Sequence, residues 1–205
     1  MNILVIGAHP DDIEIGCGGT LIKYVRRGHN VFLLLITKGE KGGDIETRYA
    51  EQVKAAEIIG AKDVFWGSFQ DTELLGKGKE IIQTVENHIR IVKPDLIFVN
   101  FSDDTHQDHR MVNQSVLSAT RYVKNVLFYE VPTTSNFIPH VFVDISDTLE
   151  GKIRVLEAHQ SQAMKTNIED LSIVEIARSA ATFRGIQGRV KYAEAFSALR
   201  LFLDI

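Results

Sequence analysis

Apolar runs and amphipathic stretches alternate along the first two thirds of the chain. The apolar runs are rich in Val, Ile, Leu and Phe and do not alternate cleanly with polar residues, as is typical of strands buried on both faces. They lie at residues 3–7, 31–36, 63–66, 95–99 and 126–130. Between them, apolar residues recur at helical spacing over 13–27, 47–60, 78–92 and 107–123. This alternation predicts an α/β fold with a mainly parallel sheet covered by helices.

The last third of the chain is less regular. One more strand is predicted at 141–144, and Ser146-Asp147-Thr148 is expected to cap a helix of about 149–160. A second helix is predicted at roughly 169–184 and a closing strand at 199–203. No linker composition or repeat divides the chain, so we expect one domain over residues 1–205 with C-terminal additions to the sheet.

Composition narrows the class of protein. The chain has 205 residues, of which 44% are hydrophobic and 24% charged, and a net charge of −4. These values are ordinary for a globular protein and do not favour nucleic-acid binding. No apolar run approaches the roughly 20 residues of a membrane span, and no signal-peptide pattern is present. Because Cys17 is the only cysteine, no internal disulfide can form, and we expect a cytoplasmic protein.

Histidine and aspartate cluster directly after two of the predicted strands. The sequence AHPDD at 8–12 follows the first strand, and DDTHQDH at 103–109 follows the fourth. In an open sheet of strand order 3-2-1-4-5, strands 1 and 4 are neighbours where the order reverses, and ligands bind beyond their carboxyl ends. The two clusters are therefore expected to converge at one site.

Imidazoles and carboxylates without cysteine suit a borderline metal such as zinc. One His and one Asp from the first cluster and one His from the second would complete a three-ligand catalytic set, and the other carboxylate of Asp11-Asp12 would act as general base. Alternatively, the histidine is a turn residue and the two aspartates only cap the helix that starts near Ile13. The run Gly16-Cys17-Gly18-Gly19 does not have the spacing of a dinucleotide loop. We interpret its glycines as close-packing positions and Cys17 as a buried, inert thiol.

The run AHPDDIEIGCGGT at 8–20, with HQDH at 106–109, resembles the LmbE-like (PIG-L) family of zinc-dependent N-deacetylases. Weaker matches are Arg48 with its helix, His159-Gln160-Ser161-Gln162, and Ala193-Glu194-Ala195-Phe196. The resemblance implies a Rossmann-like three-layer fold. It also implies hydrolysis of an acetamide, usually on an N-acetylglucosamine unit, with release of acetate and a free amine.

The resemblance also implies a role for individual residues. His9, Asp12 and His109 would bind Zn²⁺, although such a set also accepts Fe²⁺ or Co²⁺. Asp11 would be the general base, and His106, held by Asp108, would polarise or protonate the tetrahedral intermediate. The remaining implied positions are Arg48 and Asp71 as sugar contacts and Glu14 and His159 as supports behind the ligands.

Other interpretations of these four positions stay open. Glu14 can be a helix N-terminal acid, His159 a helix cap, Arg48 a solvated helix-face residue and Asp71 a turn residue. The family often has Pro-Asp-Gly where this chain has Gln70-Asp71-Thr72, which leaves the sugar pocket less certain than the metal site.

The sequence thus predicts a metal-dependent deacetylase acting on a small amino-sugar substrate, which, as is common in the family, can be a homo-oligomer. The alternative is a metal-binding module or an inactive family member. Asp11 favours the enzyme, because a site built only to hold metal needs no free carboxylate beside its ligands.

Overall fold

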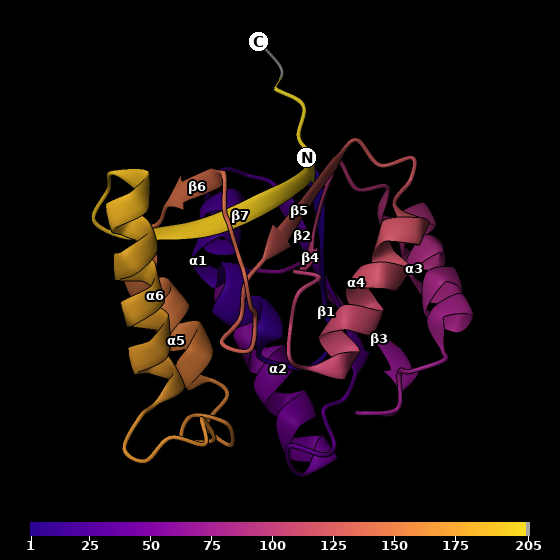
Figure 1. Ribbon diagram of the computed structural model, residues 1–205, viewed down its shortest axis with the longest axis horizontal. Coiled ribbons are helices and arrows are strands. Elements are labelled where there is room, and N and C mark those ends of the chain that lie inside the picture. The colour runs from indigo at the N-terminus through magenta and orange to yellow at the C-terminus, as the bar shows by residue number, and fades with distance from the viewer. Residues whose placement is uncertain (204–205) are drawn as a thin grey trace.

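Five parallel strands form the centre of a seven-stranded sheet in the computed structural model, which describes residues 1–203 (Figure 1). The parallel strands are β1 (Asn2–Gly7), β2 (Asn30–Thr37), β3 (Asp63–Phe69), β4 (Leu96–Asn100) and β5 (Asn125–Tyr129). Two antiparallel strands extend the sheet: β7 (Ala193–Arg200) pairs with β5, and β6 (Val141–Asp144) pairs with β7. The order β3-β2-β1-β4-β5-β7-β6 confirms the predicted 3-2-1-4-5 sheet with C-terminal additions.

Helices cover both faces of the sheet, as the three-layer prediction requires (Figure 1). One face packs against α1 (Asp12–Arg26), α2 (Ile45–Ile59) and α5 (Leu149–Glu157), and the other against α3 (Gly78–Val92) and α4 (Gln107–Ala119). The helix α6 (Ile173–Gly188) packs against β7 and α5. Successive residues of a strand enter opposite cores: Val5 lies in the α1 core and Leu4 in the α3/α4 core. This explains why the central strands are apolar at consecutive positions.

The glycines of α1 allow the helix to lie directly on the sheet. A Cβ atom at Gly16 would lie 2.1 Å from Cδ2 of Tyr129, whose ring is fully buried. The Tyr129 hydroxyl in turn donates to the carbonyl oxygen of Ile6 (2.9 Å) and to Oδ1 of Asn100 (3.1 Å), joining the carboxyl ends of β1, β4 and β5. At Gly18, by contrast, a Cβ would meet only Cγ of Lys152, at 3.6 Å. The packing interpretation of the glycines is therefore confirmed at Gly16.

Two predictions for the C-terminal third were wrong in their boundaries. The closing strand occupies Ala193–Arg200 rather than 199–203, because Arg200 already pairs with Val126 near the start of β5 and residues 201–203 have no partner strand. The last helix begins at Ile173 rather than 169. Its start is set by a capping box, in which the side chains of Ser172 and Glu175 each accept from the other's backbone N–H.

The cap predicted for the helix after β6 differs in a similar way. Thr148 occupies the N-cap position of α5, but its side chain makes no capping hydrogen bond. Instead, its hydroxyl donates to the carbonyl oxygen of Ile145 at 3.4 Å. The helix begins at the expected place without the expected contact.

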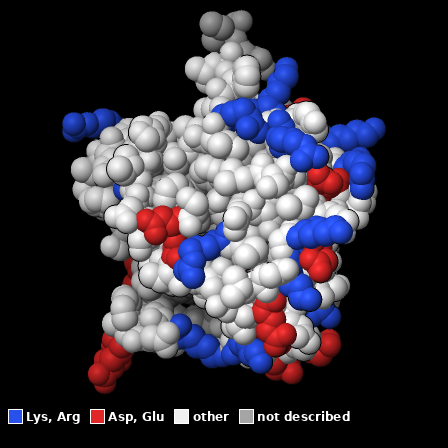
Figure 2. Space-filling model, turned by 45° about the vertical axis from the view of Figure 1, so that its right-hand side comes forward, with Lys and Arg blue, Asp and Glu red and all other residues white. Residues whose placement is uncertain are grey.

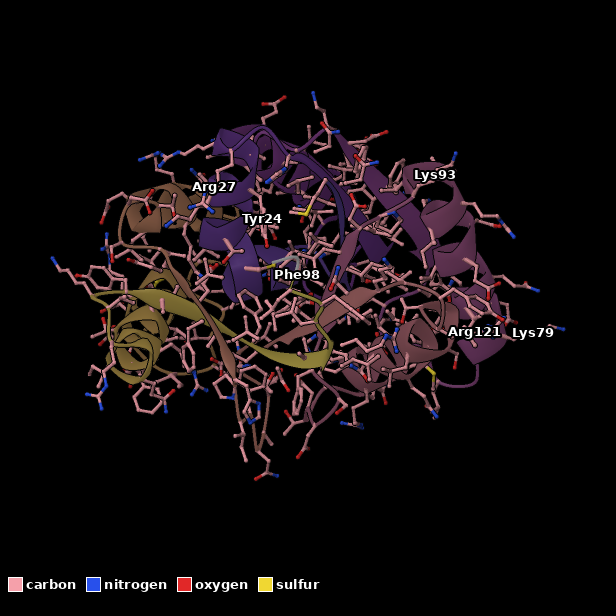
Figure 3. All side chains as sticks on the ribbon, turned by 90° about the horizontal axis from the view of Figure 1, so that it is seen from above. Tyr24, Arg27, Lys79, Lys93, Phe98 and Arg121 are labelled. Carbon is pink, nitrogen blue, oxygen red and sulfur yellow. The ribbon has the colours of Figure 1, made fainter. Side chains whose placement is uncertain are left out.

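Basic side chains gather around the amino ends of the strands. The two His/Asp clusters lie at the opposite, carboxyl ends. On the face in Figure 2, Lys and Arg side chains concentrate at the upper right. Near the amino ends of β4 and β5, Arg90, Lys93, Arg121 and Lys124 line a groove of about 870 Å³ together with Asp95 and Asn125. Figure 3 shows Lys93 and Arg121 at the periphery. Since α3 and α4 end in this region, the cations complement the negative ends of the helix dipoles.

Aromatic rings pack together in the core between α1 and the sheet. Tyr24 of α1 lies beside Phe98 of β4, with ring centroids 6.4 Å apart (Figure 3). Within residues 1–203, every helix is too short or too polar to cross a lipid bilayer.

Candidate active site

The two His/Asp clusters meet where β1 and β4 end side by side. Ile6 of β1 is in register with Val99 of β4, so the segments that follow both strands leave the sheet at the same level. The turn after β1 places Asp11 in a left-handed conformation, with φ of 90° and ψ of −28°. Asp11 stands at the N-cap of α1, yet its side chain makes no capping hydrogen bond. The helix-cap alternative is therefore wrong for Asp11, and a non-glycine residue held at positive φ is a common feature of functional sites.

The side chains of three residues, His9, Asp12 and His109, form a compact triangle at this point. Nδ1 of His9 lies 3.3 Å from Nε2 of His109, Oδ1 of Asp12 lies 3.3 Å from the same nitrogen, and Oδ2 of Asp12 lies 3.6 Å from Nδ1 of His9. All three residues are buried. Ligand atoms bound at about 2.0–2.2 Å in a tetrahedral zinc site are themselves about 3.3–3.6 Å apart. The donor types therefore suit a zinc-type ion, and each imidazole nitrogen lies at about this distance from one of the two Asp12 oxygens.

Among the described residues, two groupings bring one ligand atom from each of three residues close together, and His9 belongs to both. His9, His106 and His109 offer nitrogens within 4.8 Å of one another, and so do His9, Asp71 and Asp108 with their oxygens. The second grouping lies on the far side of the His9 ring, because Asp71 and Asp108 contact Nε2 and the triangle uses Nδ1. One imidazole can use both nitrogens in this way, binding a cation through one and donating a hydrogen bond through the other.

Buried carboxylates support both histidines of the triangle. Nε2 of His9 lies 2.9 Å from Oδ1 of Asp71 and 3.3 Å from Oδ2 of Asp108. Nδ1 of His109 lies 3.0 Å from Oδ2 of Asp104. Such partners fix the imidazole tautomer that leaves the opposite nitrogen free for a metal.

The charges of this cluster stabilise one another. Burial opposes protonation of His109, but Asp12 and Asp104 outweigh it and raise its pKa to about 9. Burial likewise opposes ionisation of Asp12, yet His109 and His9 hold the pKa of that carboxyl well below its usual range. In the absence of a cation, protons therefore occupy the imidazoles, and a bound metal would displace them.

Asp11 lies beside the triangle and belongs to a different set of contacts. Its Oδ2 is 3.2 Å from Nη2 of Arg48, whose guanidinium also donates to the carbonyl oxygens of Pro10 (2.8 Å) and Gly39 (2.7 Å). Burial, together with the nearby Asp12 charge, raises the pKa of Asp11 to about 6 in spite of Arg48. A Cβ atom at Gly39 would lie 2.5 Å from Nη1 of Arg48, so this loop needs glycine there. The interpretation of Arg48 as a solvated helix-face residue is wrong, because its side chain is buried.

The sequence profile of the PIG-L family, GlcNAc-PI de-N-acetylase, matches residues 4–120, which include both clusters. The chain belongs to the PIG-L family. It is 33% identical over 168 residues to the uncharacterized deacetylase YaiS of Escherichia coli, covering 78% of this chain and 91% of that protein. It is 30% identical over 187 residues to diacetylchitobiose deacetylase of Thermococcus kodakarensis, covering 78% and 70%. Its fold matches the crystal structure of the conserved protein TT1542 from Thermus thermophilus with a TM-score of 0.88 and 26% identity, covering 100% and 97%.

In this PIG-L protein, Asp108 and His106 are connected differently from the expectation. Oδ2 of Asp108 accepts from the backbone N–H of Thr72 (2.7 Å) and contacts His9, so the Asp108 carboxylate does not orient His106. The backbone N–H of Asp108 does so instead, donating to Nδ1 of His106 at 3.2 Å. This contact leaves Nε2 of a neutral His106 to carry the proton. Burial and the charges of His9 and His109 lower the pKa of His106, which favours this neutral form.

Glu14 and His159 form a buried layer behind the site. Oε1 of Glu14 accepts from Nε2 of Gln52 at 2.7 Å, and its other oxygen lies 3.6 Å from Nε2 of His159. Burial opposes protonation of His159, but Glu14 and Asp11 raise its pKa. Neither His159 nor Glu14 lines the catalytic pocket, so the pair lies behind it.

The catalytic pocket of the PIG-L protein is an open cleft of about 1020 Å³. The rim includes Lys41 and Gly42, His106, and the segment 131–133. Arg48 and Asp71, the predicted sugar contacts, both line it. The sequence reasoning missed the segment 164–169, which forms one wall. Gln162 and Lys165 tie this region to the other rim by donating to the carbonyl oxygen of Gly42.

Proposed function

We propose that this protein is a metal-dependent N-deacetylase that hydrolyses the acetamide of an N-acetylated amino sugar to acetate and a free amine. The observation that carries the proposal is the ionisable carboxylate of Asp11 beside a complete three-ligand triangle. Family membership supports the same activity, since YaiS of Escherichia coli and diacetylchitobiose deacetylase of Thermococcus kodakarensis are named as deacetylases. A module that only stores metal would need no such carboxylate.

The residues of the site have separate roles in amide hydrolysis. His9, Asp12 and His109 would hold the cation, which supplies Lewis-acid chemistry when bound. Asp11 takes the proton from the attacking water, and its pKa of about 6 keeps it ionised yet basic near neutral pH. Nε2–H of His106 faces the oxygen that gains negative charge as the water attacks. The nitrogen of the amide then leaves with a proton returned by Asp11 or His106, so that one water is consumed for each acetate.

The zinc identity, the sugar contacts of Arg48 and Asp71, and a homo-oligomeric cytoplasmic state stay predictions. Among cations, Zn²⁺ fits the donor set, and Fe²⁺ and Co²⁺ accept the same ligands. Arg48 also has a structural role, because its guanidinium contacts both Asp11 and the carbonyl oxygen of Gly39 and so joins the two loops.

The test is release of acetate and amine from a panel of N-acetylglucosaminides. Activity should vanish after chelation and return with Zn²⁺ or Co²⁺. Asp11→Asn should bind metal with native stoichiometry, measured by elemental analysis, while turnover falls roughly 10²–10⁴-fold, the usual contribution of a general base. Asp44→Asn is a matched control, because Asp44 only caps α2 through Thr47. Full turnover by metal-free protein would refute the proposal.

A further inference from the structure

A second, smaller cavity adjoins the catalytic pocket on the side of α6 and β7. It has a volume of about 210 Å³ and is called the side cavity below. Four residues line both spaces: Ile15, Val131, Pro132 and Ile176. The side cavity and the catalytic pocket are therefore neighbours that share a wall of apolar side chains.

One face of α6 forms a continuous wall along both spaces. Ile173 lines the catalytic pocket, Ile176 lines both, and Ala177, Ala180 and Arg184 line the side cavity. Residues three and four apart share a helix face. From residue 173 to residue 184 the helix rises about 16 Å at 1.5 Å per residue. An extended ligand lying on this face would reach from one space into the other.

The charged groups of the side cavity are already paired with each other. The Arg184 guanidinium donates to both carboxylate oxygens of Glu130, at 2.6 Å each. The Lys152 ammonium is paired with the Glu194 carboxylate. Glu194 also accepts from two backbone N–H groups of α1, at 2.9 and 2.7 Å. With these charges satisfied internally, the side cavity offers an ionic ligand no free partner.

Apart from Gly16 and Thr134, whose hydroxyl donates to Asp104, the rest of the lining is alkyl, and the space is large enough for a hydrocarbon group. Alanines at 177, 180, 181, 193 and 195 leave room that larger side chains would fill. A closed apolar cavity of about 150 Å³ in another protein binds benzene. The side cavity therefore suits a short alkyl chain or a single aromatic ring.

We propose that the side cavity binds an apolar aglycone, so that the substrate is an N-acetylated amino-sugar glycoside carrying an alkyl or aryl group. This inference rests on the proposed deacetylase function. The reacting acetyl group lies beside His9, Asp12 and His109, where the wall is polar and buried. The side cavity adjoins the pocket at Ile15, Val131, Pro132 and Ile176, and none of those three groups lines it, so we expect it to accommodate a substituent of the sugar rather than a longer acyl chain.

Binding tests the side cavity without requiring turnover. Methyl and hexyl β-glucosaminides, which carry no acetyl group, are titrated calorimetrically into the zinc-loaded protein. Each methylene that enters an apolar site contributes about 0.8 kcal/mol, or about fourfold in affinity. Hexyl carries five more methylenes than methyl, so we expect it to bind on the order of 10³-fold more tightly. Ala180→Leu, an exposed position at the cavity, should bring that ratio close to one, while Ser179→Leu, on the adjacent exposed position outside the lining, should keep it.

Acetate release separates this inference from the proposed function. The substrates are methyl and hexyl N-acetylglucosaminides and methyl N-hexanoylglucosaminide. Faster deacetylation of the hexyl glycoside, measured as kcat/KM, together with its loss in Ala180→Leu, supports the aglycone site. Equal affinity and equal kcat/KM for methyl and hexyl glycosides overturn it while leaving the deacetylase intact, and so does a preference for the N-hexanoyl substrate. If no member releases its acyl group, the proposed function fails, and the calorimetric ratio still decides whether the side cavity binds an alkyl group.

Discussion

Replacing Asp104 by asparagine tests whether the carboxylate behind His109 sets the metal affinity of the site. Three donors converge on Asp104: Nδ1–H of His109 at 3.0 Å, the backbone N–H of His106 at 2.8 Å and the hydroxyl of Thr134 at 3.1 Å. A carboxylate accepts from all three, but an asparagine side chain has one accepting oxygen and one NH₂ group. In Asp104→Asn, at least one of the donors therefore faces another donor.

A change of tautomer at His109 can relieve the mismatch, but it lowers the affinity of the site for the metal. If the asparagine NH₂ faces His109, the imidazole must accept at Nδ1 and carry its proton on Nε2, the nitrogen that belongs to the triangle. Loss of a buried carboxylate behind a metal-binding histidine typically lowers metal affinity 10–100-fold, which corresponds to about 1.4–2.7 kcal/mol. We expect a decrease of this size in the affinity for Zn²⁺.

The assay is competition for Zn²⁺ with a chromophoric chelator, using native protein, Asp104→Asn and Asp103→Asn. Asp103 is the matched control, since it is the preceding residue and is exposed, and its side chain accepts from Asn136 at 2.7 Å. Asp103→Asn should keep native affinity. Native affinity in a folded Asp104→Asn protein would show that the hydrogen bond to Nδ1 does not govern His109.

Three further predictions concern the site and its packing. His106→Ala should keep stoichiometric metal and lose turnover by about 10²–10³-fold, whereas His109→Ala should lose metal; elemental analysis and kcat on both proteins would reveal an exchange of roles. In urea unfolding, overpacking should destabilise Gly16→Ala by about 1–3 kcal/mol. Gly18→Ala should be stabilised by up to about 1 kcal/mol, because alanine favours the helix more than glycine does. Equal urea midpoints for the two variants would contradict the packing argument. Burial and, to a smaller extent, the Glu194 charge raise the pKa of the Cys17 thiol. The thiol should therefore stay unreactive toward Ellman's reagent at pH 8 until the protein is unfolded. Rapid labelling of the native protein would be the contrary result.

The sequence alone determined the sheet and the meeting of the two clusters. The apolar runs that became β1, β2, β4 and β5 are buried on both faces, so their composition reports burial directly. Parallel strands joined by helices leave few topologies, and in the one adopted here β1 and β4 are neighbours. His9 and His109 therefore had to approach each other, whatever the packing of the individual side chains.

Only the tertiary structure decided which groups support the triangle. Asp104, Asp71 and Asp108 are three aspartates among many, and their local sequence does not say which imidazole nitrogen each one faces. That choice depends on side-chain directions set by the packing of α4 and by loops distant in the chain, as when Thr72 donates to Asp108.

The structure of the C-terminal part of the chain likewise depends on contacts that the local sequence does not specify. Strand β7 is a strand because β5 and β6 lie on either side of it, and the segment 193–200 shows no continuous apolar run of its own. The wall at 164–169 and the side cavity beneath α6 likewise arise from contacts between elements more than 100 residues apart, which periodicity along the chain does not record.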